Sequence, residues 1–163
     1  MRWTFAGSLA LGLAAVAAGP ATAQAPVFNG YLSGGACYLR LYDGVHMRRN
    51  PRQTLSKFHV THRRPDPLQA QNPDAFTVHF GYWVKNAGAY SGFAQCRTTS
   101  SGATCNAEAD GGSFTLTPKS AKILRVTLGA RLGIEGQKGF SPNVATEANR
   151  VILVPVTRVG VCQ

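Results

Sequence analysis

Acidic side chains are scarce in this chain, which holds seven Asp and Glu against 17 Lys and Arg and carries a formal net charge of +10 at pH 7. Glu108 and Asp110 are the candidates for a glycosidase-like pair, because residues two apart share a face of an extended chain. They precede Gly111-Gly112, and Asp in such a place more often hydrogen-bonds its own backbone in a turn. The G-x-S-x-G motif is absent as well. We therefore expect no enzymatic activity and no catalytic residue, with a hydrolase that uses Glu108 or Asp110 as the remaining alternative.

A hydrophobic run long enough to cross a membrane is also missing. The longest apolar stretch, Leu9 to Ala18, is shorter than the roughly 20 residues that a bilayer core of about 30 Å requires. It follows Arg2 and precedes small residues at Ala21 and Ala23, which is the pattern of a cleavable signal peptide. We expect residues 1–23 to be removed before Gln24, leaving a periplasmic or secreted chain without a transmembrane segment. An uncleaved N-terminal anchor is the alternative.

The four cysteines contain no C-x2-C pair, so the usual spacing of a zinc site is absent. An even number of cysteines in an exported chain predicts two disulfides. Cys96 and Cys105 flank a polar stretch that resembles a hairpin loop, and we expect them to pair across it. Cys37 and Cys162 would then tie the start of the domain to its C-terminus. No metal and no cofactor is expected.

Long amphipathic stretches and βαβ alternation are both lacking, which argues against α/β folds. The strongest pattern is the period-two alternation of residues 75–85 (AFTVHFGYWVK), which is typical of a β-strand. About eight such short segments follow one another at the spacing of an all-β fold. We predict an antiparallel barrel-like domain over residues 36–163, because closure removes exposed sheet edges. A two-sheet β-sandwich is the alternative, and residues 24–35 are expected to be a flexible lead-in.

Residues 53–62 form another predicted strand, in which alternation places Phe58 and Val60 on one face. Leu55, Lys57 and His59 would share the opposite face. His59 and His62 would point in opposite directions, so the two imidazoles would not chelate one ion. Residues 45–50 have room for one helical turn before Pro51, and residues 63–72 read as a polar loop with two prolines.

The densest feature of the sequence is basic. No acidic residue occurs between His46 and Arg64. Guanidinium groups suit phosphate and carboxylate oxygens, because their fork donates two parallel hydrogen bonds. The predicted anion-binding residues are Arg48, Arg49, Arg52, Lys57, Arg63 and Arg64. We expect a binding or envelope-associated protein whose partner is an anionic envelope component or an acidic protein, not a nucleic acid; the alternative is that these charges are merely solvated.

A second surface is predicted on the strand at 75–85. His79, Trp83 and Lys85 share its outward face, and an exposed Trp beside a Lys often marks a contact surface. His79 itself is expected to be a surface imidazole packed on an aromatic ring, since no carboxylate is placed to orient it.

A different function is a barrel that holds a small apolar ligand, as closed barrels of about eight strands can. The side chains of Phe76, Val78, Phe80, Tyr82 and Val84 decide this alternative. If they fill the interior, no room is left for the ligand.

Three stretches carry a resemblance to a known group: residues 37–54 (CYLRLYDGVHMRRNPRQT), the hairpin from Gln95 to Cys105, and residues 110–118 (DGGSFTLTP). Together they resemble uncharacterised small secreted proteins of alphaproteobacteria, over most of the mature chain. That group implies no activity and no functional residue. In size and disulfide layout the chain is also loosely similar to periplasmic lysozyme inhibitors of the β-barrel type. Their inhibitory loop is not recognisable here, and a basic inhibitor has the wrong charge for a basic lysozyme.

Overall fold

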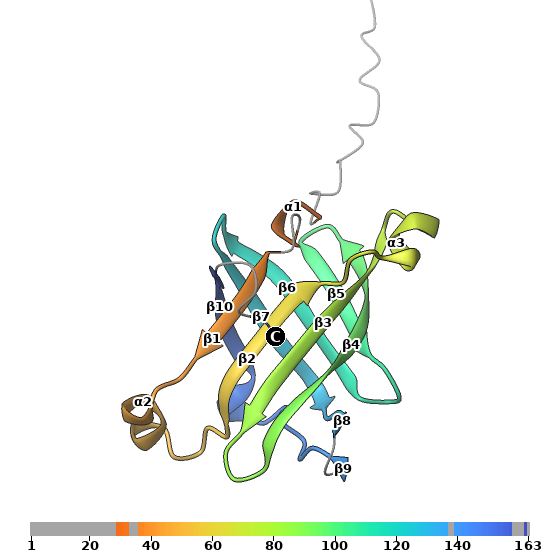
Figure 1. Ribbon diagram of the computed structural model, residues 1–163. Coiled ribbons are helices and arrows are strands. Elements are labelled where there is room, and N and C mark those ends of the chain that lie inside the picture. Colours follow the sequence, from red (N-terminus) through yellow and green to blue (C-terminus); the bar gives the residue numbers. More distant parts are fainter. Residues whose placement is uncertain (1–28, 33–35, 137–138, 158–161, 163) are drawn as a thin grey trace, which may run out of the picture.

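The computed structural model describes residues 29–32, 36–136, 139–157 and 162, and its central feature is a closed β-barrel (Figure 1). The barrel has eight strands, and every neighbouring pair is antiparallel. This confirms the predicted barrel. The predicted signal peptide, residues 1–23, lies outside the described residues.

The chain runs up and down around the barrel, and its last strand closes the circle. The barrel strands are β1 (Cys37–Leu41), β2 (Leu55–His62), β3 (Ala75–Val84), β4 (Gly88–Thr99), β5 (Gly102–Ala107), β6 (Gly112–Ser120), β7 (Ile123–Leu132) and β10 (Val151–Thr157). They are hydrogen-bonded in the order β1-β10-β7-β6-β5-β4-β3-β2. The short strands β8 (Glu135–Gly136) and β9 (Gly139–Phe140) pair with each other. The helices are α1 (Asn29–Leu32), α2 (Gly44–Arg49), α3 (Pro67–Gln71) and the 3-10 helix η2 (Glu147–Asn149).

Aromatic and aliphatic side chains fill the barrel. All five inward residues predicted on β3, from Phe76 to Val84, are buried. In the middle, the ring of Phe80 lies 6.4 Å from that of Phe58 and 5.0 Å from that of Phe114, measured between centroids. These rings occupy the space that an apolar ligand inside the barrel would need at this level.

A β-bulge near the start of β2 changes the face on which Leu55 lies. The pairing of β2 with β3 shifts between Leu55 and Lys57, and a bulge adds one residue to one strand. Leu55 is therefore in the core and 1% exposed. The prediction that it shares a face with Lys57 and His59 is wrong, because simple alternation does not include the extra residue.

Two helices differ from expectation. Asp66 caps the N-terminus of α3 and Pro67 occupies its first turn. This combination favours the start of a helix, here inside the predicted polar loop.

In α1, Leu32 is buried in the core, and the Tyr38 hydroxyl donates a hydrogen bond to the Tyr31 carbonyl (2.9 Å). Tyr31 and Leu32 of the lead-in therefore pack on the barrel, while residues 24–28 and 33–35 of the flexible segment expected at 24–35 lie outside the described residues. The helical turn expected before Pro51 is present as α2.

Both predicted disulfides are present. Cys96 and Cys105 face each other directly on β4 and β5, with a Cα–Cα distance of 4.0 Å, and both are buried in the core. Cys37 and Cys162 are joined across a sequence separation of 125 residues. Two disulfides are consistent with an oxidising compartment. Among the described residues, no helix combines the length and the hydrophobicity that crossing a bilayer requires.

Candidate functional site

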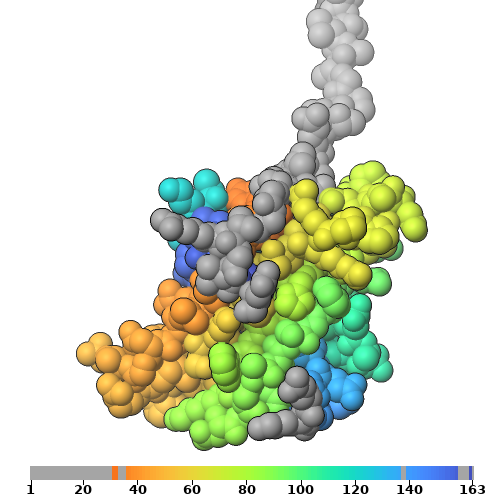
Figure 2. Space-filling model, viewed as in Figure 1, coloured from red at the N-terminus to blue at the C-terminus, as the bar shows by residue number. Residues whose placement is uncertain are grey.

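The six predicted anion-binding residues lie at the two ends of β2 and on its outer face. Arg48 and Arg49 are in the last turn of α2 and Arg52 follows shortly after, whereas Arg63 and Arg64 come directly after β2. Figure 1 shows α2 and α3 at opposite ends of the barrel, and in Figure 2 the region of α2 projects from the body of the molecule. The structure therefore makes two arginine patches, with Lys57 on the strand between them.

Local hydrogen bonds hold the α2 patch in place. The Asp43 carboxylate accepts a hydrogen bond from the His46 backbone N–H (2.7 Å), and the His46 ring stacks on Tyr42 at 4.6 Å. All five arginines of the two patches are exposed. In the part of the chain that the structure describes, none of them forms an ion pair, although Glu147 lines the same hollow as Arg52. Their charges are thus available to a partner.

A groove on the outer face of the barrel brings together residues from both predicted sets. Lys57 on β2 and Trp83 on β3 are direct cross-strand partners, and Trp83 is 49% exposed. The groove has a volume of about 630 Å³, within the usual range for a small-molecule site. Its lining includes Lys57, His59, His79, Trp83, Tyr90 and Ser91. Lys85, the third member of the predicted contact surface, is exposed beyond the end of β3 and does not line this groove.

His59 is the unusual residue of the groove, because it is 6% exposed and neither ring nitrogen has a hydrogen-bond partner. Its cross-strand neighbour is Gly81, where an added Cβ would lie 2.5 Å from His59 Cε1. Glycine at position 81 therefore leaves the space that the ring occupies. A neutral imidazole carries one donor and one acceptor, and leaving both unpaired costs free energy.

Burial, with smaller contributions from the charges of His79 and Lys57, lowers the pKa of His59 to about 4. The His79 ring lies 5.5 Å from that of His59, and burial lowers the pKa of His79 as well. Both imidazoles are therefore neutral at pH 7. On the other side of His79 lies Phe93, whose ring centroid is 5.3 Å from that of His79. The Arg63 guanidinium lies 4.9 Å from the centroid of the Phe93 ring. His79 thus packs on an aromatic ring, that of Phe93, and is half-buried, whereas the sequence predicts a surface imidazole.

We expect the buried imidazole of His59 to make stability depend on pH. Because its pKa is about 4 in the folded state and about 6.5 in the unfolded state, the unfolded chain binds more protons between these values. The free energy of unfolding should therefore fall from pH 7 to pH 4, by up to about 3 kcal/mol more than in His59→Gln. Urea unfolding of both proteins at the two pH values measures this difference. Equal losses in both would mean that His59 titrates normally.

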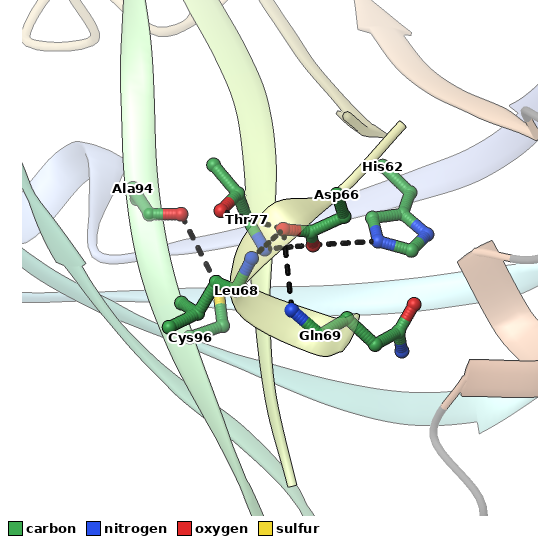
Figure 3. Close-up of polar contacts among 7 residues, drawn as sticks. All are labelled: His62, Asp66, Leu68, Gln69, Thr77, Ala94 and Cys96. Atoms are coloured by element: carbon green, nitrogen blue, oxygen red, sulfur yellow. Dashed lines mark hydrogen bonds and ion pairs between the residues drawn. The ribbon is translucent and has the colours of Figure 1, made fainter. Parts of the chain in front are cut away.

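A second polar cluster joins α3 to the barrel (Figure 3). The Asp66 carboxylate accepts hydrogen bonds from the Thr77 backbone N–H (2.5 Å) and hydroxyl (3.1 Å), and lies 3.0 Å from His62 Nε2. It also caps α3 through the backbone N–H groups of Leu68 and Gln69. Burial raises the pKa of Asp66, but the hydrogen bonds from Thr77, His62 and Gln69 outweigh it and the net pKa is lowered. This cluster is enclosed and supports the fold.

His62 and His59 occupy opposite faces of β2, as predicted. His62 packs edge-on against the inward ring of Phe76, while His59 lies over Gly81 on the outside. The sequence reasoning missed the pairing of His62 with Asp66. Their spacing of four residues was visible, but only the turn after β2 brings the two side chains together.

Glu108 and Asp110 lie in the turn between β5 and β6. Both are exposed, Asp110 has a φ of 58°, and the Gly111 N–H donates a hydrogen bond to the Glu108 carbonyl at 3.0 Å. This geometry favours the turn interpretation of these two acids.

The described residues include no group of three or more His, Cys, Asp or Glu side chains placed to hold a metal ion. No protein-family model matches the chain, and neither a curated protein nor a solved structure matches it significantly.

Proposed function

We propose that this protein is a non-enzymatic binding protein of the periplasm or cell exterior that attaches to an anionic partner through its two arginine patches. One observation carries the proposal: the five arginines are exposed and, among the described residues, none of them forms an ion pair with an acidic side chain. The scarcity of acidic residues leaves the net charge at +10. A positive field of this size attracts anions and speeds their encounter with the protein.

The separation of the patches favours an extended partner. β2 has eight residues, which at about 3.3 Å per residue span roughly 25 Å. This distance exceeds the Debye length of about 8 Å at physiological salt, so the patches act as separate contacts. A polymer or a surface engages both at once and gains avidity, whereas a small anion engages one.

The location is part of the same proposal. The predicted signal peptide directs export, and the two disulfides suit the oxidising compartment that an exported chain enters. The anionic polymers and surfaces of the envelope are accessible there.

Neutralising the α2 patch should weaken binding. The variant Arg48→Gln/Arg49→Gln/Arg52→Gln should bind acidic polysaccharide at least about tenfold more weakly, since each Lys or Arg near an anionic surface contributes about 1 kcal/mol. Binding of the wild type should also fall steeply between about 50 mM and about 500 mM salt. Co-sedimentation or calorimetry with sodium alginate measures both effects.

The matched control removes three charges elsewhere. Lys119, Lys122 and Arg131 are exposed on or near β6 and β7, and changing all three to Gln lowers the net charge by the same amount. The control should retain most of the affinity. Equal losses in the two variants would show that only net charge matters, and binding indifferent to salt would overturn the proposal.

A further inference from the structure

The unpartnered imidazole of His59 is the feature that points to a ligand in the groove. The side chain lines the groove, yet both ring nitrogens are buried without a partner. Rotating the ring by half a turn about Cβ–Cγ exchanges its carbons and nitrogens, which presents a nitrogen where a carbon now lies. A neutral imidazole then needs a donor and an acceptor, and a hydroxyl group is both. A ligand with several hydroxyl groups therefore complements His59 and its neighbour His79.

The rest of the groove adds an apolar face and one positive charge. The half-exposed indole of Trp83 offers a flat apolar surface, and Lys57 lies directly across from it on β2. An ammonium group at this place pairs with a carboxylate. Ser91, the partner of Gly81 on β4, contributes a further hydroxyl to the lining. The ligand that fits all these groups has a ring with an apolar face, hydroxyl groups and one carboxylate.

We propose that the groove binds a uronic acid unit, and that the anionic partner is an acidic polysaccharide. The sugar ring stacks on Trp83, its carboxylate pairs with Lys57, and its hydroxyl groups hydrogen-bond to His59 and His79. The arginine patches at both ends of β2 bind carboxylates of neighbouring units along the same polymer. This inference rests on the proposed function and narrows its anionic partner to an acidic polysaccharide; the acyclic headgroup of phosphatidylglycerol has no ring to place in the groove.

The native fluorescence of the protein provides the test. The chain has two tryptophans, Trp3 and Trp83, and Trp3 belongs to the predicted signal peptide, so Trp83 is the only one in the processed chain. Titrating the disulfide-bonded processed protein with tri-galacturonic acid at about 50 mM salt should change the intensity and wavelength of its emission. A neutral trisaccharide, maltotriose, should change neither. Vesicles of phosphatidylglycerol test the lipid alternative.

Variants locate the binding. Lys57→Met should weaken binding of tri-galacturonic acid by about tenfold or more, measured by fluorescence. Trp83→Ala should weaken binding of tri-galacturonic acid by a similar factor, measured by calorimetry. Lys122→Met removes the same charge from the turn between β6 and β7 and should leave the affinity unchanged. Thermal unfolding checks that each variant is folded.

The outcomes separate this inference from the proposed function. If alginate still binds in a salt-dependent way while Lys57→Met and Trp83→Ala bind like the wild type, the groove is not the site and the arginine patches alone act. Binding to phosphatidylglycerol vesicles without binding to tri-galacturonic acid would also overturn the inference of a uronic acid ligand, while supporting the proposal of an anionic partner. An equal response to maltotriose would refute the role of the charge. If neither alginate nor vesicles bind, both proposals fail.

Discussion

Replacing Cys37 and Cys162 together by alanine should lower the free energy of unfolding by about 5 kcal/mol. The disulfide closes a loop with a sequence separation of 125 residues, and in the chain-entropy model a loop of this size restricts the unfolded chain strongly. Such a loss is comparable to the total stability of many small domains, roughly 5–15 kcal/mol. We therefore expect the variant to be near its unfolding transition at about 37 °C.

The second disulfide is the matched comparison. Cys96 and Cys105 have a sequence separation of nine, for which the same model predicts a stabilisation of about 3 kcal/mol. Guanidinium unfolding of the wild type and of the two double-alanine variants, followed by circular dichroism, gives the three free energies. A larger loss from the short loop than from the long one would contradict the entropic explanation and indicate that packing of the buried cystine dominates.

The substitution Asp66→Ala should lower the free energy of unfolding by about 4 kcal/mol. Removing one partner of a buried pair leaves the groups that contacted it without a hydrogen-bond partner. It removes the acceptor of the Thr77 N–H and hydroxyl, of His62, and of two backbone N–H groups of α3. Asp66→Asn retains one carbonyl acceptor, so its loss in the free energy of unfolding should be markedly smaller. Equilibrium unfolding in urea of the three proteins at pH 7 measures the series, and a loss below about 1 kcal/mol for Asp66→Ala would show that water replaces the carboxylate.

The Asp66 carboxylate makes the free energy of unfolding depend on pH in a range of its own. Its pKa is lowered in the folded state, so the stability it contributes is present above the unfolded value of about 4 and is lost as the pH falls through the folded value. Asp66→Asn should lack this acid-induced loss. The window of His59 lies higher, between about 4 and 6.5, so the two residues are distinguishable by titration of stability.

Much of the fold was predictable from the sequence because alternation and burial agree along β3. Its inward residues from Phe76 to Val84 are buried, and a period of two has no other regular explanation. The disulfides followed from the hairpin between Cys96 and Cys105 and from the even count. The bulge before Lys57 was not predictable, since an extra residue in a strand depends on the pairing of β2 with β3 and not on the composition of either.

The candidate site was predictable only in its parts. Lys57 and Trp83 were identified on separate grounds, and it is the pairing of β2 with β3 that makes them neighbours. The burial of His59 has one sequence signal, the glycine at position 81 in the middle of a strong strand pattern, because glycine at such a place often admits another group. That signal gains meaning only once the partner across the strand is known.

The position of β10 governs the order in which the barrel can be completed. Among the described residues, β10 is the last strand in sequence, and it pairs with both β1 and β7. Until it is in place, the earlier strands can form no more than an open sheet with two unsatisfied edges, which is a state prone to associate with other chains. Cys162 follows β10 in the sequence, so the disulfide links the first barrel strand to a residue that lies beyond the closing strand. A truncation before Val151 therefore removes the closing strand and the long disulfide together, whereas a truncation between Thr157 and Cys162 removes the disulfide and leaves β10.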